Sequence, residues 1–172
     1  MVSKKICVIG QFAVGKTSLV RRYVLDEFSH DYQATLGVNI YKYSDTVDYP
    51  AGGETTLNQI IWDIEGGDTN PEKTGTYIQG AAGALVVGDI TRAETIAAMS
   101  DHARLFQSLR PGRPIAFALN KIDLLEEPPA MDADERLTKE FGADVVRTSA
   151  ANGTAVPELF RRLGGRILEI GA

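Results

Sequence analysis

The fold is decided by a stretch near the N-terminus, which reads Gly10-Gln11-Phe12-Ala13-Val14-Gly15-Lys16-Thr17. It matches the pattern G-x-x-x-x-G-K-[ST], whose glycines let the backbone curl so that successive N–H groups point inward at phosphate oxygens. In this pattern the lysine contacts the β- and γ-phosphates and the final hydroxyl binds Mg²⁺. An apolar run over residues 6–10 precedes the stretch and a helical pattern over residues 16–25 follows it, as the motif requires. The alternative is a glycine turn with a surface lysine. We predict a nucleotide site that includes Gly10, Ala13, Val14, Gly15, Lys16, Thr17 and Ser18.

Outward from this stretch, short apolar runs alternate with helical patterns. Buried strands are predicted at residues 6–10, 84–89, 115–120 and 145–148, and helices at residues 16–25, 91–109, 131–141 and from Val156 onward. Two stretches that alternate apolar and polar residues, 38–49 and 55–63, flank Pro50-Ala51-Gly52-Gly53 and predict a hairpin. The polar, glycine-punctuated residues 66–76 are predicted to form a mobile loop.

This alternation predicts one domain over residues 1–172, of the α/β class. The sheet should have six strands, mostly parallel, with helices on both faces. The hairpin should add one antiparallel edge strand. The length is about that of one domain and is enough to bury a core.

The composition restricts the partners and the compartment. A net charge of −5 argues against nucleic acid or an anionic membrane as the main partner. The single cysteine, Cys7, lies in an apolar run, so we predict a buried, inert thiol. One cysteine cannot form an intrachain disulfide, which fits a reducing cytosol. We expect a cytoplasmic protein without an intrinsic membrane anchor, because we find no leader, membrane-spanning run or C-terminal cysteine for prenylation.

A second motif, Trp62-Asp63-Ile64-Glu65-Gly66, ends the strand after the hairpin. An acid at the carboxyl end of such a strand lies on the ligand-binding edge of the sheet. Asp63 is therefore predicted to hold Mg²⁺ through water, since Mg²⁺ keeps most of its hydration shell. Taken alone, Asp63 could equally be a turn residue at a strand end.

A third motif, Asn120-Lys121-Ile122-Asp123, follows the apolar strand at residues 115–120. The Asp123 carboxylate can accept hydrogen bonds from N1–H and the exocyclic amine of guanine, a donor pair that adenine lacks. Asn120 can tie loops together, and the Lys121 stem can lie along the base. Ser149-Ala150-Ala151 would bring a backbone N–H to the guanine oxygen. The alternatives are a polar turn and an ordinary loop before a helix.

Together these motifs resemble those of the Ras superfamily of small GTPases, closest to its Rab and Ras branches, over residues 6–168. Supporting stretches are Thr35-Leu36-Gly37-Val38, Tyr77-Ile78-Gln79-Gly80-Ala81, Asp89-Ile90-Thr91 and residues 158–163. The resemblance implies the three-layer P-loop NTPase fold of small G proteins. It also implies a switch that binds GTP or GDP with Mg²⁺ and hydrolyses GTP.

The resemblance assigns further roles. Phe28 would pack against the base, Tyr32 would close over the phosphates, and Thr35 would ligate Mg²⁺ in the triphosphate state. Gly66 would donate its N–H to the γ-phosphate, so the implied catalytic residues are Lys16, Thr35 and Gly66. For Phe28 and Tyr32 a plain core or surface role is the alternative. Effectors and regulators would bind through residues 35–43 and 66–77.

Three departures from the family pattern bear on hydrolysis. The family's Asp-x-Ala-Gly-Gln here ends in Glu65-Gly66-Gly67, so Gly67 replaces the glutamine that orients the attacking water. Glu65 is expected to repel the γ-phosphate unless Mg²⁺ or water mediates, and Phe12 stands where the family usually has a small residue. We expect slow hydrolysis, with Gln11, Asp68, Asn70 or a partner as possible substitutes.

Two other functions compete with this interpretation. One is a nucleotide-loaded binding module that barely hydrolyses GTP and serves a regulatory or structural role. The other, an ATP-dependent kinase or ATPase, is disfavoured by residues 120–123 and by the lack of a lid or substrate domain. His30 and His102 are predicted to be surface histidines, residues 126–127 and 132–135 a solvated face, and Trp62 either core or a partner contact.

Overall fold

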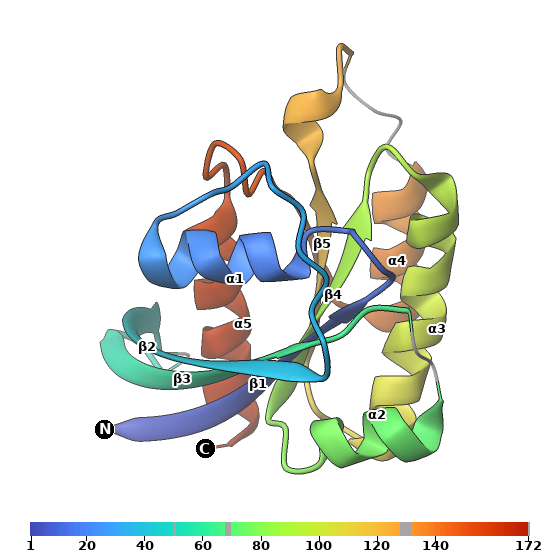
Figure 1. Ribbon diagram of the computed structural model, residues 1–172. Helices are drawn as coiled ribbons and strands as arrows, with labels where there is room; N and C mark the ends of the chain where they lie inside the picture. The colour runs from blue at the N-terminus through green and yellow to red at the C-terminus, as the bar shows by residue number, and fades with distance from the viewer. Residues whose placement is uncertain (50, 68–69, 128–131, 172) are drawn as a thin grey trace.

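The computed structural model describes residues 1–49, 51–67, 70–127 and 132–171. Strands and helices alternate along most of the chain (Figure 1). In order, the elements are β1 (Val2–Gly10), α1 (Lys16–Leu25), β2 (Val38–Asp48), β3 (Glu54–Ile64), α2 (Pro71–Ile78), β4 (Gly83–Asp89), α3 (Ala93–Leu109), β5 (Ile115–Asn120), a short 3₁₀ helix (Ile122–Leu124), α4 (Asp132–Phe141), β6 (Asp144–Arg147) and α5 (Val156–Ile170). Pro50, Asp68 and Met131, which carried predictions, lie outside the described residues.

The strands form one six-stranded sheet in the order β2-β3-β1-β4-β5-β6. Only the β2–β3 pair is antiparallel; the other neighbouring strands pair in parallel. The predicted sheet and its antiparallel edge strand are therefore confirmed. In this register Asp63 lies beside Val8, and Asp89 lies beside Asn120. The carboxyl ends of the parallel strands, which carry the motifs, thus meet at one edge of the sheet.

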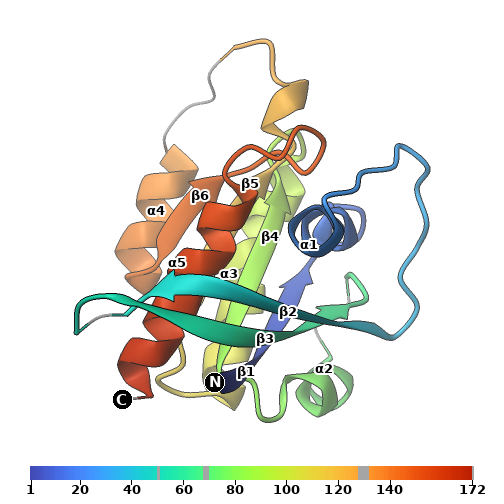
Figure 2. The same ribbon diagram turned by 90° about the vertical axis from the view of Figure 1, so that its left-hand side faces the viewer.

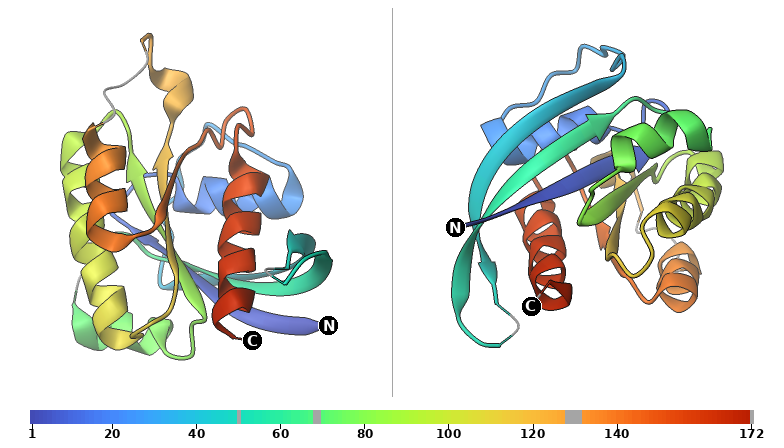
Figure 3. Two further views of the ribbon diagram at one scale, coloured as in Figure 1. Left: turned by 180° about the vertical axis from the view of Figure 1, so that it is seen from behind. Right: turned by 90° about the horizontal axis from the view of Figure 1, so that it is seen from below.

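Two helical layers cover the sheet. Helices α1 and α5 lie on one face, and α2, α3 and α4 lie on the other (Figures 1 and 3). Successive side chains of β1 point to opposite faces, so Ile6 and Val8 pack with α1 and α5, whereas Cys7 packs with α3. Cys7 is fully buried, as predicted, and burial raises the pKa of its thiol to about 12.

The predicted mobile loop at residues 66–76 is wrong in its second half, because helix α2 begins there. The Asn70 side chain accepts a hydrogen bond from the Glu72 N–H at 3.0 Å, and a proline occupies the first turn. Both are helix-start features. They were hidden by the polar composition and by Gly75 inside the helix. Other element ends shift by a few residues; β1 begins at Val2 because residues 2–5 pair with Leu57–Ile60 of β3.

The prediction for His102 is also wrong. Its side chain is buried on the face of α3 that carries Met99 and Phe106 toward the sheet. Burial lowers the pKa of His102, and the charge of Lys16 lowers it further. His30, by contrast, is exposed as predicted. A helix with the length and apolarity to cross a bilayer does not occur in the part of the chain that the structure describes.

Candidate functional site

A cleft of about 730 Å³ opens at the edge of the sheet where the carboxyl ends of the strands meet. The segment between α1 and β2 runs along the outside of α1 and forms one wall (Figure 2). Most of the predicted nucleotide residues line this cleft: Ala13, Gly15, Lys16, Thr17, Ser18, Phe28, Tyr32, Thr35, Gly66, Asn120, Lys121, Asp123, Ala150 and Ala151. Four predicted residues do not line it: Gly10, Val14, Asp63 and Ser149.

The loop between β1 and α1 curls tightly against Asn120, the first residue of the third motif. Gly15 has a φ of +96° and stands directly before α1. A Cβ atom at this position would lie 2.3 Å from Nδ2 of Asn120, so both the conformation and the space require glycine. The loop therefore presents its backbone at the N-terminus of α1, where helix N–H groups favour an anion.

Lys16 folds back over this loop and is only 6% exposed. Its Nζ donates hydrogen bonds to the carbonyl oxygens of Gln11 at 2.7 Å and Gly10 at 3.2 Å. Burial lowers the pKa of Lys16 to about 8, although the charge of Asp63 opposes the shift. A Cβ added to Gly66 would lie 2.8 Å from this Nζ, so the Gly66 backbone lies directly against the lysine.

Three oxygen-bearing side chains meet beside Lys16. The Thr17 hydroxyl donates to Oδ2 of Asp63 at 2.5 Å, and Oγ1 of Thr35 lies 2.7 Å from Oγ1 of Thr17. Asp63 is fully buried, and its second oxygen, Oδ1, has no hydrogen-bond partner among the described residues. Burial raises the pKa of Asp63. The hydrogen bond from Thr17, the charge of Lys16 and the hydroxyl of Thr35 oppose this rise, in that order of size. Such an oxygen-only set matches the ligands that Mg²⁺ takes.

Asn120 joins the loops on the base side of the cleft. Its Nδ2 donates to the Val14 carbonyl at 3.1 Å. Its Oδ1 accepts from the Thr148 hydroxyl at 3.1 Å and from the Ala150 N–H at 3.3 Å. The predicted tie between loops is therefore present. The Ser149 hydroxyl donates to Oδ1 of Asp123 at 2.7 Å, which brings that carboxylate into the same group.

Three residues of the site were missed in the sequence. Oδ2 of Asp89, a buried residue, lies 2.9 Å from Nζ of Lys121, which in turn donates to the Ala13 carbonyl. Arg22 holds the loop that follows β6 by donating hydrogen bonds to the Ala150 carbonyl at 2.8 Å and to the Ala151 carbonyl at 2.7 Å. Arg92 donates to the Phe12 carbonyl at 3.0 Å. Asp89 was noted only as part of a family stretch, and the two arginines carried no sequence signal.

The Glu65 carboxylate has two partners that the sequence did not indicate. Its Oε2 accepts a hydrogen bond from the Gly37 N–H at 3.0 Å, and the same carboxylate forms an ion pair with Lys73 of α2. Lys73 therefore pairs with this charge, and the expected repulsion of the γ-phosphate stays a prediction.

The other two departures, Phe12 and Gly67, lie in and against the loop between β1 and α1. Phe12 is half exposed, and its ring meets that of Tyr32 edge-on. Gly67 donates its N–H to the Gly10 carbonyl at 3.2 Å, so it lies over the loop. Of the proposed substitutes for glutamine, Gln11 is within 3.5 Å of a Cβ built on Gly67, whereas Asn70 caps α2.

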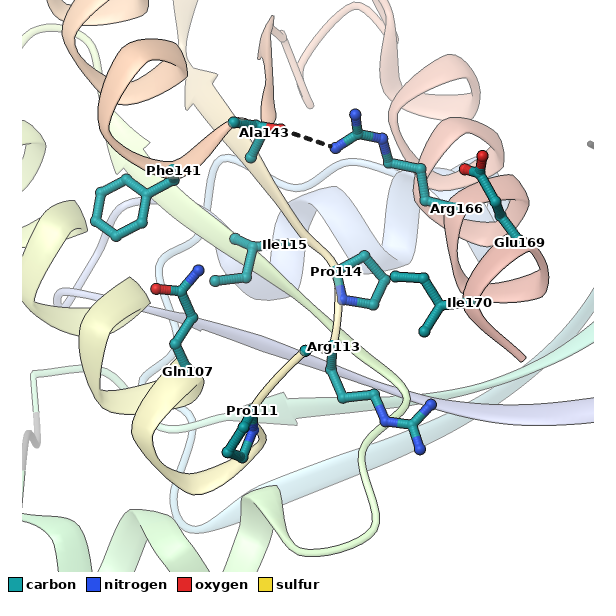
Figure 4. A pocket seen from close by; sticks show the side chains of 12 residues that line it. Gln107, Pro111, Arg113, Pro114, Ile115, Phe141, Ala143, Arg166, Glu169 and Ile170 are labelled. Atoms are coloured by element: carbon teal, nitrogen blue, oxygen red, sulfur yellow. Dashed lines mark hydrogen bonds between the residues drawn. The ribbon is translucent and has the colours of Figure 1, made fainter. Parts of the chain in front are cut away.

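A second cavity, of about 550 Å³, lies at the opposite ends of the strands (Figure 4). It is bordered by the end of α3, the start of β5 and the end of α5, and Arg166 donates to the Gly142 carbonyl beside it at 3.2 Å. None of the predicted site residues lines it, so the chemistry of the three motifs belongs to the first cleft.

Comparison with known proteins identifies the family of the chain. The Ras family model matches residues 5–169. The chain is 33% identical to the Ras-related protein Rab-31 of Mus musculus over 171 residues, which is 97% of this chain and 84% of that protein. It is 32% identical to Rab-22A of Canis lupus familiaris, covering 95% and 82% of the two chains, and 36% identical to RABA4a of Arabidopsis thaliana, covering 96% and 72%. The chain therefore belongs to the Ras family of small GTP-binding proteins.

Proposed function

We propose that this protein is a guanine-nucleotide switch that binds GTP or GDP with Mg²⁺ and hydrolyses GTP slowly. The slow step is inferred from Gly67, which the resemblance assigns to the family's glutamine position and whose N–H donates to the Gly10 carbonyl of the phosphate loop. GTP binding itself follows from membership of the family.

The nucleotide would be held at its two ends. The phosphates would lie in the curl of residues 10–17, against Lys16 and the N-terminus of α1. The base would lie between Phe28 and Lys121, with Asp123 accepting from its edge. The close approach of Asn120 to the Gly15 position would keep the two ends of the site at a fixed spacing.

Mg²⁺ would be held by the hydroxyls of Thr17 and Thr35 and, through water, by Asp63. The fit rests on the 2.5 Å and 2.7 Å spacings of these oxygens and on the buried Oδ1 of Asp63, which the described residues leave without a partner. When bound, the ion would neutralise charge on the β- and γ-phosphate oxygens. Thr35 would thereby connect the residues 35–43, which carry the exposed Ile40, to the nucleotide.

Hydrolysis would be slow because Gly67 has no side chain with which to orient the attacking water. Phosphoryl transfer depends mainly on positioning and on charge stabilisation, so the loss of a positioning side chain is costly. Phe12 adds a ring where an arginine from an activator would approach. If hydrolysis is negligible, the protein is instead a nucleotide-loaded binding module that acts through residues 35–43 and 66–77.

One experiment separates these functions. The nucleotide that copurifies with the protein is identified by chromatography, and a single turnover of GTP is then timed with Mg²⁺. We expect bound GDP or GTP and a rate clearly below the intrinsic rate of about 4 × 10⁻⁴ s⁻¹ typical of a glutamine-bearing relative. A rate equal to that value would overturn the slow step, and no measurable turnover would favour the binding module.

A further inference from the structure

Glu65 connects the two segments that would contact partners. Its backbone N–H donates to the Gly37 carbonyl at 2.8 Å, and its side chain accepts from the Gly37 N–H at 3.0 Å. The first bond extends the β2–β3 ladder by one step beyond the Val38–Ile64 pair. The second is made by a side chain, so it depends on the residue type at position 65.

The carboxylate of Glu65 is held on its other side by α2. It forms an ion pair with Lys73, and its side chain is only 20% exposed. A hydrogen bond to a charged, partly buried acceptor is stronger than one between neutral groups. In the family pattern this position is an alanine, which has no acceptor. The tie from Gly37 through Glu65 to Lys73 is thus a property of this chain.

The tie acts close to the predicted Mg²⁺ site. Thr35 is two residues before Gly37, and two residues span about 7 Å at most. Its Oγ1 lies 2.7 Å from Oγ1 of Thr17. Gly37 has a φ of +70°, and a Cβ there would lie 3.5 Å from the hydroxyl of Tyr77. Fixing Gly37 therefore confines Thr35 to the neighbourhood of Thr17.

We infer that Glu65 is a positioning residue that holds Thr35 at the Mg²⁺ site in the GDP state as well as in the GTP state. The inference rests on the proposed function, because it assumes that nucleotide and Mg²⁺ occupy the cleft. Its consequence is a 35–43 segment that stays closed after hydrolysis. Partners that bind this segment would then discriminate less between the two nucleotides.

The direct test is hydrogen exchange of the Gly37 amide, followed by NMR on the full chain loaded with GDP and Mg²⁺. The variants are Glu65→Ala, which removes the acceptor, and Glu65→Gln, which keeps an oxygen but loses the charge. Glu72→Gln is the matched control, since it removes an exposed acid from the same region. We expect exchange at least about tenfold faster in Glu65→Ala, a smaller increase in Glu65→Gln, and no change in Glu72→Gln.

A second measurement tests the link to Mg²⁺. Release of a fluorescent GDP analogue is timed in Mg²⁺ and in EDTA for the same proteins. Glu65→Ala should speed release in Mg²⁺ about threefold or more and leave the EDTA rate unchanged, because the effect passes through Thr35 and the ion. A residue that only stabilises the fold would change both rates.

The outcomes separate the inference from the proposed function. Equal Gly37 exchange in the wild type and Glu65→Ala, or in Glu65→Gln if the alanine variant does not fold, overturns the inference while nucleotide binding stands. Acceleration in both Mg²⁺ and EDTA also overturns it. A wild-type protein that carries no guanine nucleotide and takes none up overturns the proposed function, and with it the premise of the inference.

Discussion

The ring of Phe12 stands edge-on to the ring of Tyr32, with centroids 5.4 Å apart and planes at 72°. Phe12 belongs to the phosphate loop, and Tyr32 belongs to the segment that walls the cleft. Edge-to-face aromatic pairs contribute about 0.5–1.5 kcal/mol beyond their buried area. The pair therefore joins the two sides of the cleft directly over the place proposed for the phosphates.

We expect the contact between Phe12 and Tyr32 to slow the release of nucleotide from the cleft. Phe12→Ala should release a fluorescent GDP analogue about two- to tenfold faster in Mg²⁺, because the edge-on contact is lost. Tyr32→Ala should have the same effect, and the double variant should be no faster than either single one. An unchanged rate in Phe12→Ala would show that the ring contact does not retain nucleotide.

Gly67→Gln should raise the single-turnover rate of GTP hydrolysis. The new amide can orient water, but Gly67 has a φ of +84°, which costs a glutamine about 1–2 kcal/mol. We therefore expect a gain of about tenfold. Gly80→Gln is the matched control, because Gly80 has a φ of +76° and lies away from the cleft. No gain in Gly67→Gln would mean that the missing glutamine does not limit the reaction.

Lys16→Ala should weaken GDP binding about 10- to 100-fold, since a hydrogen bond to a charged group contributes about 1.5–3 kcal/mol. Binding is measured by calorimetry, and circular dichroism checks that the variant is folded. Lys42→Ala removes an exposed lysine from β2 and should leave affinity unchanged. A Lys16→Ala protein that bound GDP as tightly as the wild type would show that the phosphate assignment is wrong.

The phosphate loop and the residues 120–123 were predictable because each is a local motif whose spacing is dictated by one ligand. The sheet was predictable for a related reason, since alternating apolar runs and helical patterns allow few topologies. These local signals need no knowledge of which distant segments pack together.

Most of the features that were missed depend on such packing. Helix α2 differs, because it begins with local signals, the Asn70 cap and a proline, that the polar composition hid. Whether His102 faces the sheet is decided by neighbours on other elements. The same holds for Glu65, whose carboxylate was expected near phosphate but is engaged by Gly37 and Lys73. Arg22 is a further case, because an arginine on a helix resembles any solvated side chain until the Ala150 loop is seen beside it.

Stability should depend on the ionisation of Asp45, whose side chain is 10% exposed. Its Oδ2 accepts from Tyr23 at 2.9 Å and from Arg161 at 2.8 Å, which joins α1, β2 and α5. Burial would raise the pKa of Asp45, but the hydrogen bonds from Arg161, Tyr23 and the Thr46 N–H, and then the charge of Arg161, hold it below its ordinary value.

The pKa of Asp45 is lower in the folded state than in the unfolded state. Its contribution to stability is therefore fully present above its ordinary pKa of about 4 and is lost as the pH falls through the folded-state pKa. Asp45→Asn should therefore lower the free energy of unfolding by about 1–3 kcal/mol at pH 7 and by much less at pH 3, as measured by urea titration. Asp101→Asn, which removes an exposed partner of Arg104, should cost less than about 0.5 kcal/mol at either pH. A gap between the wild type and Asp45→Asn that stays constant from pH 7 to pH 3 would show that the ionised carboxylate is not what joins the three elements.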